Sequence, residues 1–237
     1  VALKNYCKDG SWFWSRLTLG PVLDKEGKCT HFLGIQEDIT QQRIHEEYIE
    51  HQHSHDHLTG LPNQKAFELF LEQSLETQHD SLPPLTLFYI DLDDFKSLND
   101  SLGHQVGDQI LKSVAERLQN FLTEGDFLSR FAEDEFALLM SGPPDQKSVI
   151  AVAEKILDLL SQLFQVDHHQ IHLSASIGIG VNNASIQRSS DLLYQSVWAM
   201  KEAKKQGRNT WQCYKESHHN VSPEIDYAHL RLELREA

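Results

Sequence analysis

Residues Phe127–Met140, which read FLSRFAEDEFALLM, carry the clearest structural signal in the chain. They predict two short apolar strands joined by a tight acidic turn, Ala132-Glu133-Asp134-Glu135. Charge held between buried strands is costly unless a cation lies beside it, so the turn favours a metal ion or a cationic partner. A solvated surface hairpin is the alternative that this stretch leaves open when it is taken alone.

A second acidic cluster follows a continuous apolar run. Leu85–Ile90 predicts a buried strand, and the chain continues directly into Asp91-Leu92-Asp93-Asp94-Phe95-Lys96. Carboxylates at the ends of neighbouring strands are held rigidly, which makes Asp91 and Asp134 the best candidates for metal ligands. Mg²⁺ favours one or two carboxylates together with phosphate oxygens and water. For the strand-end cluster alone, turn and helix-cap roles are the alternative.

Other polar groups suit a nucleotide. Asn99 and Asp108 offer amide and carboxylate edges that match a purine such as guanine. Lys204 and Arg208 lie four residues apart near a predicted helix end, where their cations can bind phosphate. Compensation of the helix dipole, with Gly207 as the stop signal, explains the same two cations without a ligand.

Strands and helices alternate along the rest of the chain. The periodicity predicts helices at 40–57, 64–79, 146–164 and 189–205, and one with Ile110, Leu111, Val114, Leu118 and Leu122 on a single face. Asn63 is the expected cap of the helix at 64–79. Further strands are predicted at Trp12–Leu19, Cys29–Glu37, 171–181 and Trp211–Tyr214. Because one hairpin interrupts this alternation, the expected fold is α/β (α+β), with a central mixed sheet flanked by helices.

The composition excludes several function classes. A formal net charge of −14 over 237 residues argues against a nucleic-acid partner or an anionic membrane surface. The three cysteines, Cys7, Cys29 and Cys213, are far apart, which favours reduced thiols in a cytoplasmic protein. No apolar run approaches the roughly 20 residues that span a bilayer. Because it has no initiator Met and no signal peptide, the sequence is expected to be a segment of a longer protein. Whether that longer protein has membrane-spanning parts is left open.

The first 39 residues resemble the C-terminal end of a PAS sensor domain. The resemblance rests on KDGSWFW, PVLDKEG and HFLGIQEDIT, at residues 8–14, 21–27 and 31–40. The helix at 40–57 is amphipathic but poor in apolar residues, so it is expected to need a partner. We therefore expect residues 1–39 to be a PAS fragment and 40–57 to be a signalling helix, which together support a homodimer.

Roughly residues 55–215 resemble the GGDEF domain, the diguanylate cyclase family of cyclic di-GMP signalling, and the domain is expected at 58–216. The resemblance rests, in family order and spacing, on DHLTGLPN, IDLDDFKSLNDSLGHQVGDQIL, RFAEDEF, SASIGIG and AKKQGRN, which begin at residues 56, 90, 130, 174 and 203. It implies a fold like the adenylyl cyclase catalytic core. It also implies the condensation of two GTP molecules, held on two facing domains, with loss of pyrophosphate.

The same resemblance implies roles for individual residues. The metal ligands for Mg²⁺ (or Mn²⁺) would be Asp91, Asp134 and the Leu92 carbonyl, with Asp134 catalytic in an active enzyme. The nucleotide contacts would be Asn99, Asp108, Phe95, Lys96, Lys204 and Arg208.

Two departures from the family pattern affect the expected activity. Ala132 and Glu133 replace the two glycines of the signature Gly-Gly-Asp/Glu-Glu-Phe turn. Ala132 would cost about 1 kcal/mol if a left-handed backbone is required. A Glu133 carboxylate about 5 Å from a phosphate charge would cost roughly 3 kcal/mol at an effective dielectric near 20. The product-inhibition motif Arg-x-x-Asp keeps Asp126 but has Thr123 in place of arginine, so feedback binding is not expected.

The amphipathic stretch YAHLRLELREA at residues 227–237 resembles the opening helix of an EAL phosphodiesterase domain, so residues 217–237 are expected to form a linker and that helix. Three functions are open at this point. The first is a degenerate GGDEF domain that binds GTP or GDP with Mg²⁺ and regulates an attached EAL phosphodiesterase. The second is a working diguanylate cyclase, and the third is a nucleotide-free dimerisation module.

Overall fold

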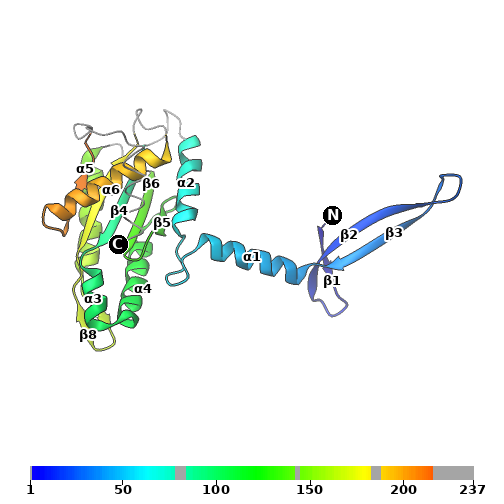
Figure 1. The fold of residues 1–237 in the computed structure, drawn as a ribbon, viewed down its shortest axis with the longest axis horizontal. Coiled ribbons are helices and arrows are strands. Elements are labelled where there is room, and N and C mark those ends of the chain that lie inside the picture. Colours follow the sequence, from blue (N-terminus) through cyan, green and yellow to red (C-terminus); the bar gives the residue numbers. More distant parts are fainter. Residues whose placement is uncertain (1, 78–83, 142–144, 183–187, 216–237) are drawn as a thin grey trace. The chain divides into compact units, whose positions relative to one another are not determined.

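The computed structural model describes residues 2–77, 84–141, 145–182 and 188–215 (Figure 1). The chain divides into two compact units, Val1–His53 and Ser54–Ala237. The predicted linker and EAL helix at 217–237 lie outside the described residues. Within the described ranges, no helix is long and apolar enough to cross a membrane.

The first unit contains an antiparallel sheet in the order β1-β2-β3. Its strands are β1 (Ala2–Tyr6), β2 (Trp12–Leu23) and β3 (Cys29–Asp38). The prediction of two strands was therefore incomplete, because β1 adds a third. The predicted strand Trp12–Leu19 was too short, since pairing between β2 and β3 continues as far as Leu23 and Cys29.

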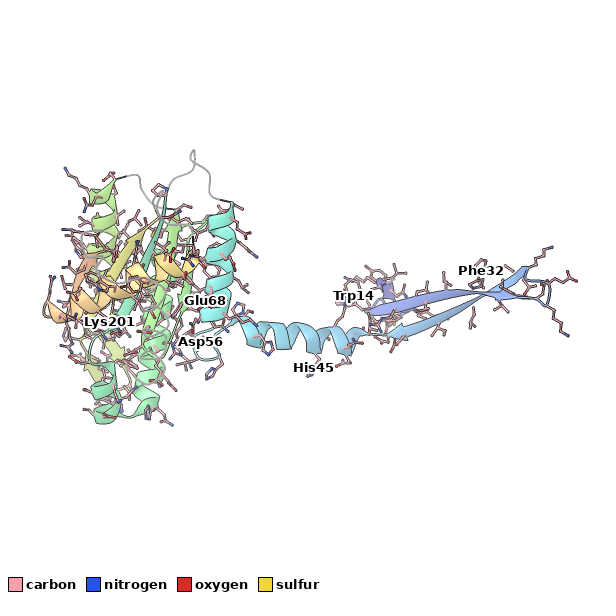
Figure 2. All side chains as sticks on the ribbon, turned by 45° about the horizontal axis from the view of Figure 1, so that its top comes forward. Trp14, Phe32, His45, Asp56, Glu68 and Lys201 are labelled. Carbon is pink, nitrogen blue, oxygen red and sulfur yellow. The ribbon has the colours of Figure 1, made fainter. Side chains whose placement is uncertain are left out.

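Helix α1 (Thr40–Ser54) begins at the end of β3. The Asp38 carboxylate accepts a hydrogen bond from the Thr40 amide at 2.9 Å, and the Thr40 hydroxyl accepts one from the Trp14 amide at 2.8 Å. Arg43 places its guanidinium 4.1 Å from the centre of the Trp14 ring, which lies at this junction (Figure 2). These contacts fix the start of the helix to the sheet of the first unit.

The predicted end of this helix at residue 57 was wrong. The chain leaves the helix after Ser54, because the Asp56 amide donates to the Leu61 carbonyl at 2.8 Å and the Ser54 carbonyl accepts from the Asn63 amide. Asn63 then caps α2 (Gln64–Glu76), since its side chain accepts a hydrogen bond from the Ala66 amide at 3.0 Å. The predicted cap is confirmed.

The second unit is built on a five-stranded mixed sheet in the order β10-β9-β4-β6-β5. Its strands are β4 (Leu85–Leu92), β5 (Phe127–Arg130), β6 (Glu135–Ser141), β9 (Ala175–Val181) and β10 (Thr210–Cys213). Strand β10 runs parallel to β9, and the other neighbours are antiparallel. The predicted mixed sheet is confirmed, and the predicted hairpin is β5 and β6.

Helices cover both faces of this sheet (Figure 1). They are α3 (Phe95–Leu102), α4 (His104–Phe121), α5 (Gln146–Ser161) and α6 (Ser189–Lys205), together with α2. One hydrophobic core joins the sheet to α2 and α6, and the other joins the opposite face to α3, α4 and α5. All eight residues of β4 are buried, with Tyr89 in the first core and Phe88 in the second. The strand therefore reads as a continuous apolar run.

The helix predicted at 146–164 and the strand predicted at 171–181 were both too long. An additional hairpin, β7 (Phe164–Val166) with β8 (His169–Ile171), lies between α5 and β9. Helix α5 ends at Ser161, and β9 begins only at Ala175.

Helix α6 lies unusually close to β9. A Cβ atom on Gly178 would stand 1.9 Å from the Ser196 carbonyl oxygen and 2.2 Å from the Met200 amide nitrogen. Only glycine allows this approach of backbone to backbone. The packing sets the height of α6 over the sheet and brings Lys204, in its last turn, to the strand end that carries Asp91.

Candidate functional site

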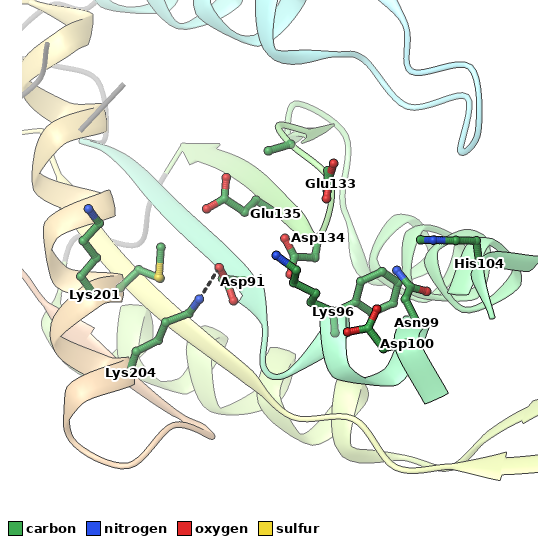
Figure 3. Close-up of a pocket in the computed structure, with 13 residues that line it drawn as sticks. Asp91, Lys96, Asn99, Asp100, His104, Glu133, Asp134, Glu135, Lys201 and Lys204 are labelled. Carbon is green, nitrogen blue, oxygen red and sulfur yellow. Dashed lines mark hydrogen bonds and ion pairs between the residues drawn. The ribbon is translucent and has the colours of Figure 1, made fainter. Parts of the chain in front are cut away.

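A cavity of about 670 Å³ opens where the end of β4 meets the start of β6 (Figure 3). Six of the residues predicted for the site line it, namely Asp91, Phe95, Lys96, Asn99, Asp134 and Lys204. Leu92, Asp108 and Arg208 are not among the lining residues. Six of the nine residues predicted to bind metal or nucleotide therefore line one cavity, which lies at the sheet end where the metal was predicted.

Asp91 is a buried carboxylate of the cavity, with 4% of its surface exposed. Its Oδ2 accepts a hydrogen bond from Lys204 Nζ at 2.6 Å, while its buried Oδ1 has no partner among the described residues. Burial raises the pKa of Asp91 to about 7, although the Lys204 ammonium acts in the opposite direction. A buried carboxylate oxygen without a partner suits a cation, so Asp91 fits the role of metal ligand.

The neighbouring acidic turn is fastened to the same strand end. The Leu92 amide donates to the Asp134 carbonyl at 3.1 Å, which holds the two sequence-predicted ligand segments together. Glu135 is buried opposite Asp91 and accepts a hydrogen bond from the Tyr89 hydroxyl at 2.8 Å. Burial raises the pKa of both Asp134 and Glu135.

The side chains that could bind a metal here suit Mg²⁺, which also takes phosphate oxygens and water as ligands, better than a metal bound by protein side chains alone. Within the described ranges, no group of three His, Cys, Asp or Glu side chains is arranged to hold a metal ion. Five side chains that line the cavity are carboxylates and three are lysines. This excess of negative charge favours a divalent cation, and Mg²⁺ commonly takes one or two carboxylates plus phosphate oxygens and water.

The purine-matching residues lie on α3 and α4. Asn99 Oδ1 is buried without a hydrogen-bond partner in the described part of the chain, so it can accept from a nucleobase N–H. Gly107 lies against this oxygen, since a Cβ there would stand 1.8 Å from it. Asp108 follows Gly107 but is exposed outside the cavity lining. His104, which was not predicted from the sequence, also lines the cavity (Figure 3).

The two predicted phosphate ligands are placed differently. Lys204 lines the cavity. Arg208 lies after the end of α6, where its backbone is left-handed with a φ of 63°, and its Nε lies 3.7 Å from Asp94 Oδ1. Lys201 lines the cavity in addition. The sequence carried a signal for Lys201, because it precedes Lys204 by three residues and shares its helix face.

The signature turn is not strained by its substitutions. Apart from glycines, the residues with left-handed φ in the described ranges are Asp94, Asp167, Arg208 and Asn209, so Ala132 and Glu133 are not among them. Ala132 therefore does not pay the conformational cost that a left-handed backbone would impose on alanine. Glu133 is exposed and lines the cavity beside Asp134 (Figure 3), so its effect is one of charge and size.

Arg130 joins this turn to the loop that follows α1. Its Nη1 lies 3.0 Å from Asp56 Oδ1, and its Nη2 donates to the Glu133 carbonyl at 2.6 Å. The Arg130 and Asp56 side chains are only 11% and 15% exposed. Thr59 donates both its amide and its hydroxyl to the same Asp56 oxygen. Sequence reasoning missed this ion pair, whose two residues lie 74 positions apart.

Replacing Arg130 by alanine is expected to lower the free energy of unfolding by about 2 kcal/mol, because charged hydrogen bonds to two segments are lost. Urea unfolding of Arg130→Ala, Asp56→Ala and the double variant measures this effect. We expect a coupling energy of about 1 kcal/mol between the two sites. Purely additive losses would show that the ion pair does not stabilise the domain.

Asp126, the residue that is kept from the product-inhibition motif, forms hydrogen bonds within its own turn. Asp126 Oδ2 accepts hydrogen bonds from both the amide and the hydroxyl of Thr123, each at 2.8 Å. The carboxylate that remains of the motif therefore stabilises the turn before β5, and threonine supplies no guanidinium for a phosphate.

Comparison with known proteins identifies the family. Residues 53–210 match the family model described as diguanylate cyclase, GGDEF domain. The bifunctional diguanylate cyclase/cyclic di-GMP phosphodiesterase MucR of Pseudomonas aeruginosa is 35% identical over 183 residues, which are 77% of this chain and 26% of MucR. The cyclic di-GMP phosphodiesterase NbdA of the same organism is 34% identical over 160 residues, which are 68% of this chain and 20% of NbdA.

A solved structure agrees with these relatives. The crystal structure of the GGDEF domain of TpbB (YfiN) from Pseudomonas aeruginosa matches with a TM-score of 0.63 at 30% identity, over 66% of this chain and 98% of that domain. The chain thus spans about a quarter or less of the length of MucR and NbdA but the whole of a GGDEF domain. With a family match over most of its length, this chain belongs to the GGDEF domain family.

Proposed function

We propose that this GGDEF domain binds GTP or GDP with Mg²⁺ (or Mn²⁺) and regulates an EAL-type cyclic di-GMP phosphodiesterase in the same protein, rather than making cyclic di-GMP. One observation carries the proposal. The exposed carboxylate of Glu133 lines the same cavity as Asp91, Asp134 and Lys204. It adds negative charge where the phosphates of a nucleotide would lie, and charge repulsion there acts against the reaction.

The retained groups support binding. Asp91 and Asp134 would hold Mg²⁺, while Lys204, already 2.6 Å from Asp91, would share its charge with a phosphate oxygen. Bound Mg²⁺ would neutralise phosphate charge as a Lewis acid. Asn99 would accept a hydrogen bond from the guanine edge through its buried, unpartnered Oδ1.

The regulatory part of the proposal draws on the relatives and on the sequence. MucR is named as both a cyclase and a phosphodiesterase, and NbdA is named as a phosphodiesterase. Both are several times longer than this chain, and residues 227–237 resemble the opening helix of an EAL domain. We place the domain in the cytoplasm, where GTP is available, and expect it to act as a homodimer through residues 1–57.

A working diguanylate cyclase is the second candidate. The observation that favours it is the unstrained signature turn, which keeps Asp134 beside Asp91 despite Ala132 and Glu133. In that case Asp134 would be catalytic, and two domains of a dimer would face each other across two GTP molecules.

One experiment separates these functions. The purified 237-residue chain is incubated with GTP and Mg²⁺ or Mn²⁺, and both nucleotide binding and dinucleotide formation are measured against an Asp134→Ala control. We expect micromolar binding with no product above the control. Product above the control would overturn the proposal in favour of the cyclase. Absence of GTP and GDP binding would overturn it in favour of a nucleotide-free dimerisation module.

A further inference from the structure

Asp93 is a buried carboxylate to which neither the metal nor the base assignment gives a role. It is 6% exposed and lies directly after β4, two residues beyond Asp91. Its Oδ1 accepts a hydrogen bond from the Ser176 hydroxyl at 2.7 Å, and its Oδ2 accepts one from the Ser174 hydroxyl at 2.7 Å. The two serines flank the first residue of β9, so Asp93 ties two neighbouring strand ends together.

A third hydrogen bond reaches a different part of the chain. The Asn209 amide donates to Asp93 Oδ2 at 3.0 Å, across 116 positions of sequence. Asn209 belongs to the turn that follows α6 and leads into β10. Asp93 therefore receives one donor from the segment that carries Arg208.

That turn needs support from outside itself. Arg208 and Asn209 adopt left-handed φ values of 63° and 47° in succession. Such a backbone is unfavourable for most residues other than glycine, and arginine tolerates it less well than asparagine does. A charge-assisted hydrogen bond from the Asn209 amide to a buried carboxylate offsets this cost at one fixed position.

The direction of Arg208 depends on this arrangement. The left-handed turn ends the helical path of α6 before Arg208, and the Arg208 Nε lies 3.7 Å from Asp94 Oδ1. Asp94 is the immediate neighbour of Asp93. The same strand end therefore controls both the backbone beside Arg208 and the resting place of its guanidinium.

We propose that Asp93 is a positioning residue for phosphate recognition, because it holds the Arg208-Asn209 turn, from which the Arg208 guanidinium would move from its place near Asp94, outside the cavity lining, to the distal phosphates of a bound nucleotide. The inference rests on the proposed nucleotide function and adds a residue that acts only through Arg208. It follows that Asp93 affects affinity for a triphosphate and leaves affinity for a monophosphate unchanged.

Asp93→Asn is the direct test, since it keeps the size of the side chain but removes charge and replaces one acceptor by a donor. We expect about tenfold weaker GTP binding, the loss associated with one charged contact, and GMP binding within about twofold of wild type. Arg208→Ala should give the same selective loss. The double variant should bind GTP no more weakly than either single variant, because both changes remove one contribution.

Two controls separate positioning from general stability. Ser174→Ala removes a hydroxyl partner of Asp93 and leaves the Asn209 contact, so it should lower the unfolding temperature without changing the GTP-to-GMP affinity ratio. Amide hydrogen exchange at Asn209 should be slow in wild type and in Arg208→Ala, and fast in Asp93→Asn.

The outcomes distinguish this inference from the function on which it rests. Equal losses for GTP and GMP in Asp93→Asn, or losses that add to those of Arg208→Ala, would overturn the positioning role alone. A wild-type protein that binds neither GTP nor inorganic tripolyphosphate would overturn the nucleotide function, and this inference with it.

Discussion

Replacing Ala132 and Glu133 by two glycines is expected to make dinucleotide formation from GTP measurable, with a rate about a hundredfold above a wild-type rate that we expect to lie below detection. The physical reason is electrostatic, because a carboxylate about 5 Å from a phosphate costs roughly 3 kcal/mol at an effective dielectric near 20. Each 1.36 kcal/mol changes a rate about tenfold. Product formation with GTP and Mg²⁺, followed by chromatography, measures the change.

Single substitutions assign the effect within the turn. Glu133→Gly should account for nearly all of the gain, because Ala132 does not occupy a left-handed backbone and Ala132→Gly relieves no strain. Glu133→Gln removes the charge but keeps the length of the side chain, so it separates repulsion from bulk. Asp134→Ala in the glycine background should abolish product. Unchanged activity in both Glu133 variants would show that the turn charge does not limit the reaction.

The elements with long apolar patterns were predictable from sequence, and the short ones were not. Strand β4 and helix α6 follow from an unbroken apolar run and from a helical stripe that stops before Gly207. Helix α3 has eight residues and no side-chain cap, since Asp94 at its start adopts a left-handed φ of 54°. Strands β7 and β8 have three residues each, which is too short for a period to be recognised.

The residues of the site could also be predicted only in part, because some of their positions depend on contacts between distant segments. Asp91 and Asp134 were predictable because each stands at the end of a clear strand, and sheet register brings such ends together. Arg208 was expected to bind phosphate together with Lys204 near the helix end, but its backbone is left-handed and it does not line the cavity. The sequence predicts no individual role for Asp93 within the acidic cluster at the strand end. Its three partners come from the start of β9 and from the turn before β10, and no local pattern connects them.

Replacing Asp91 by asparagine is expected to have opposite effects on the metal-free and Mg²⁺-bound domain. Burial raises the pKa of Asp91 in the folded protein to about 7, from an ordinary value of 3.8. The folded state thus holds a proton that the unfolded state releases, so the metal-free wild type loses stability as the pH rises from about 4 to 7. The asparagine side chain does not titrate, and the Asp91→Asn variant should unfold at a higher temperature than metal-free wild type above about pH 7.

Addition of Mg²⁺ should reverse the order. At a Mg²⁺ concentration about one hundred times its dissociation constant, the wild type should gain about 2.7 kcal/mol, while Asp91→Asn should gain nothing. Unfolding temperatures across pH, measured in a chelator and then in Mg²⁺, test both effects. Asp94→Asn is the matched control, because Asp94 is 71% exposed at the same strand end and asparagine tolerates its left-handed backbone. Parallel pH curves for wild type and Asp91→Asn would mean that Asp91 is charged at neutral pH without metal, and Lys204 would then be sufficient to neutralise it.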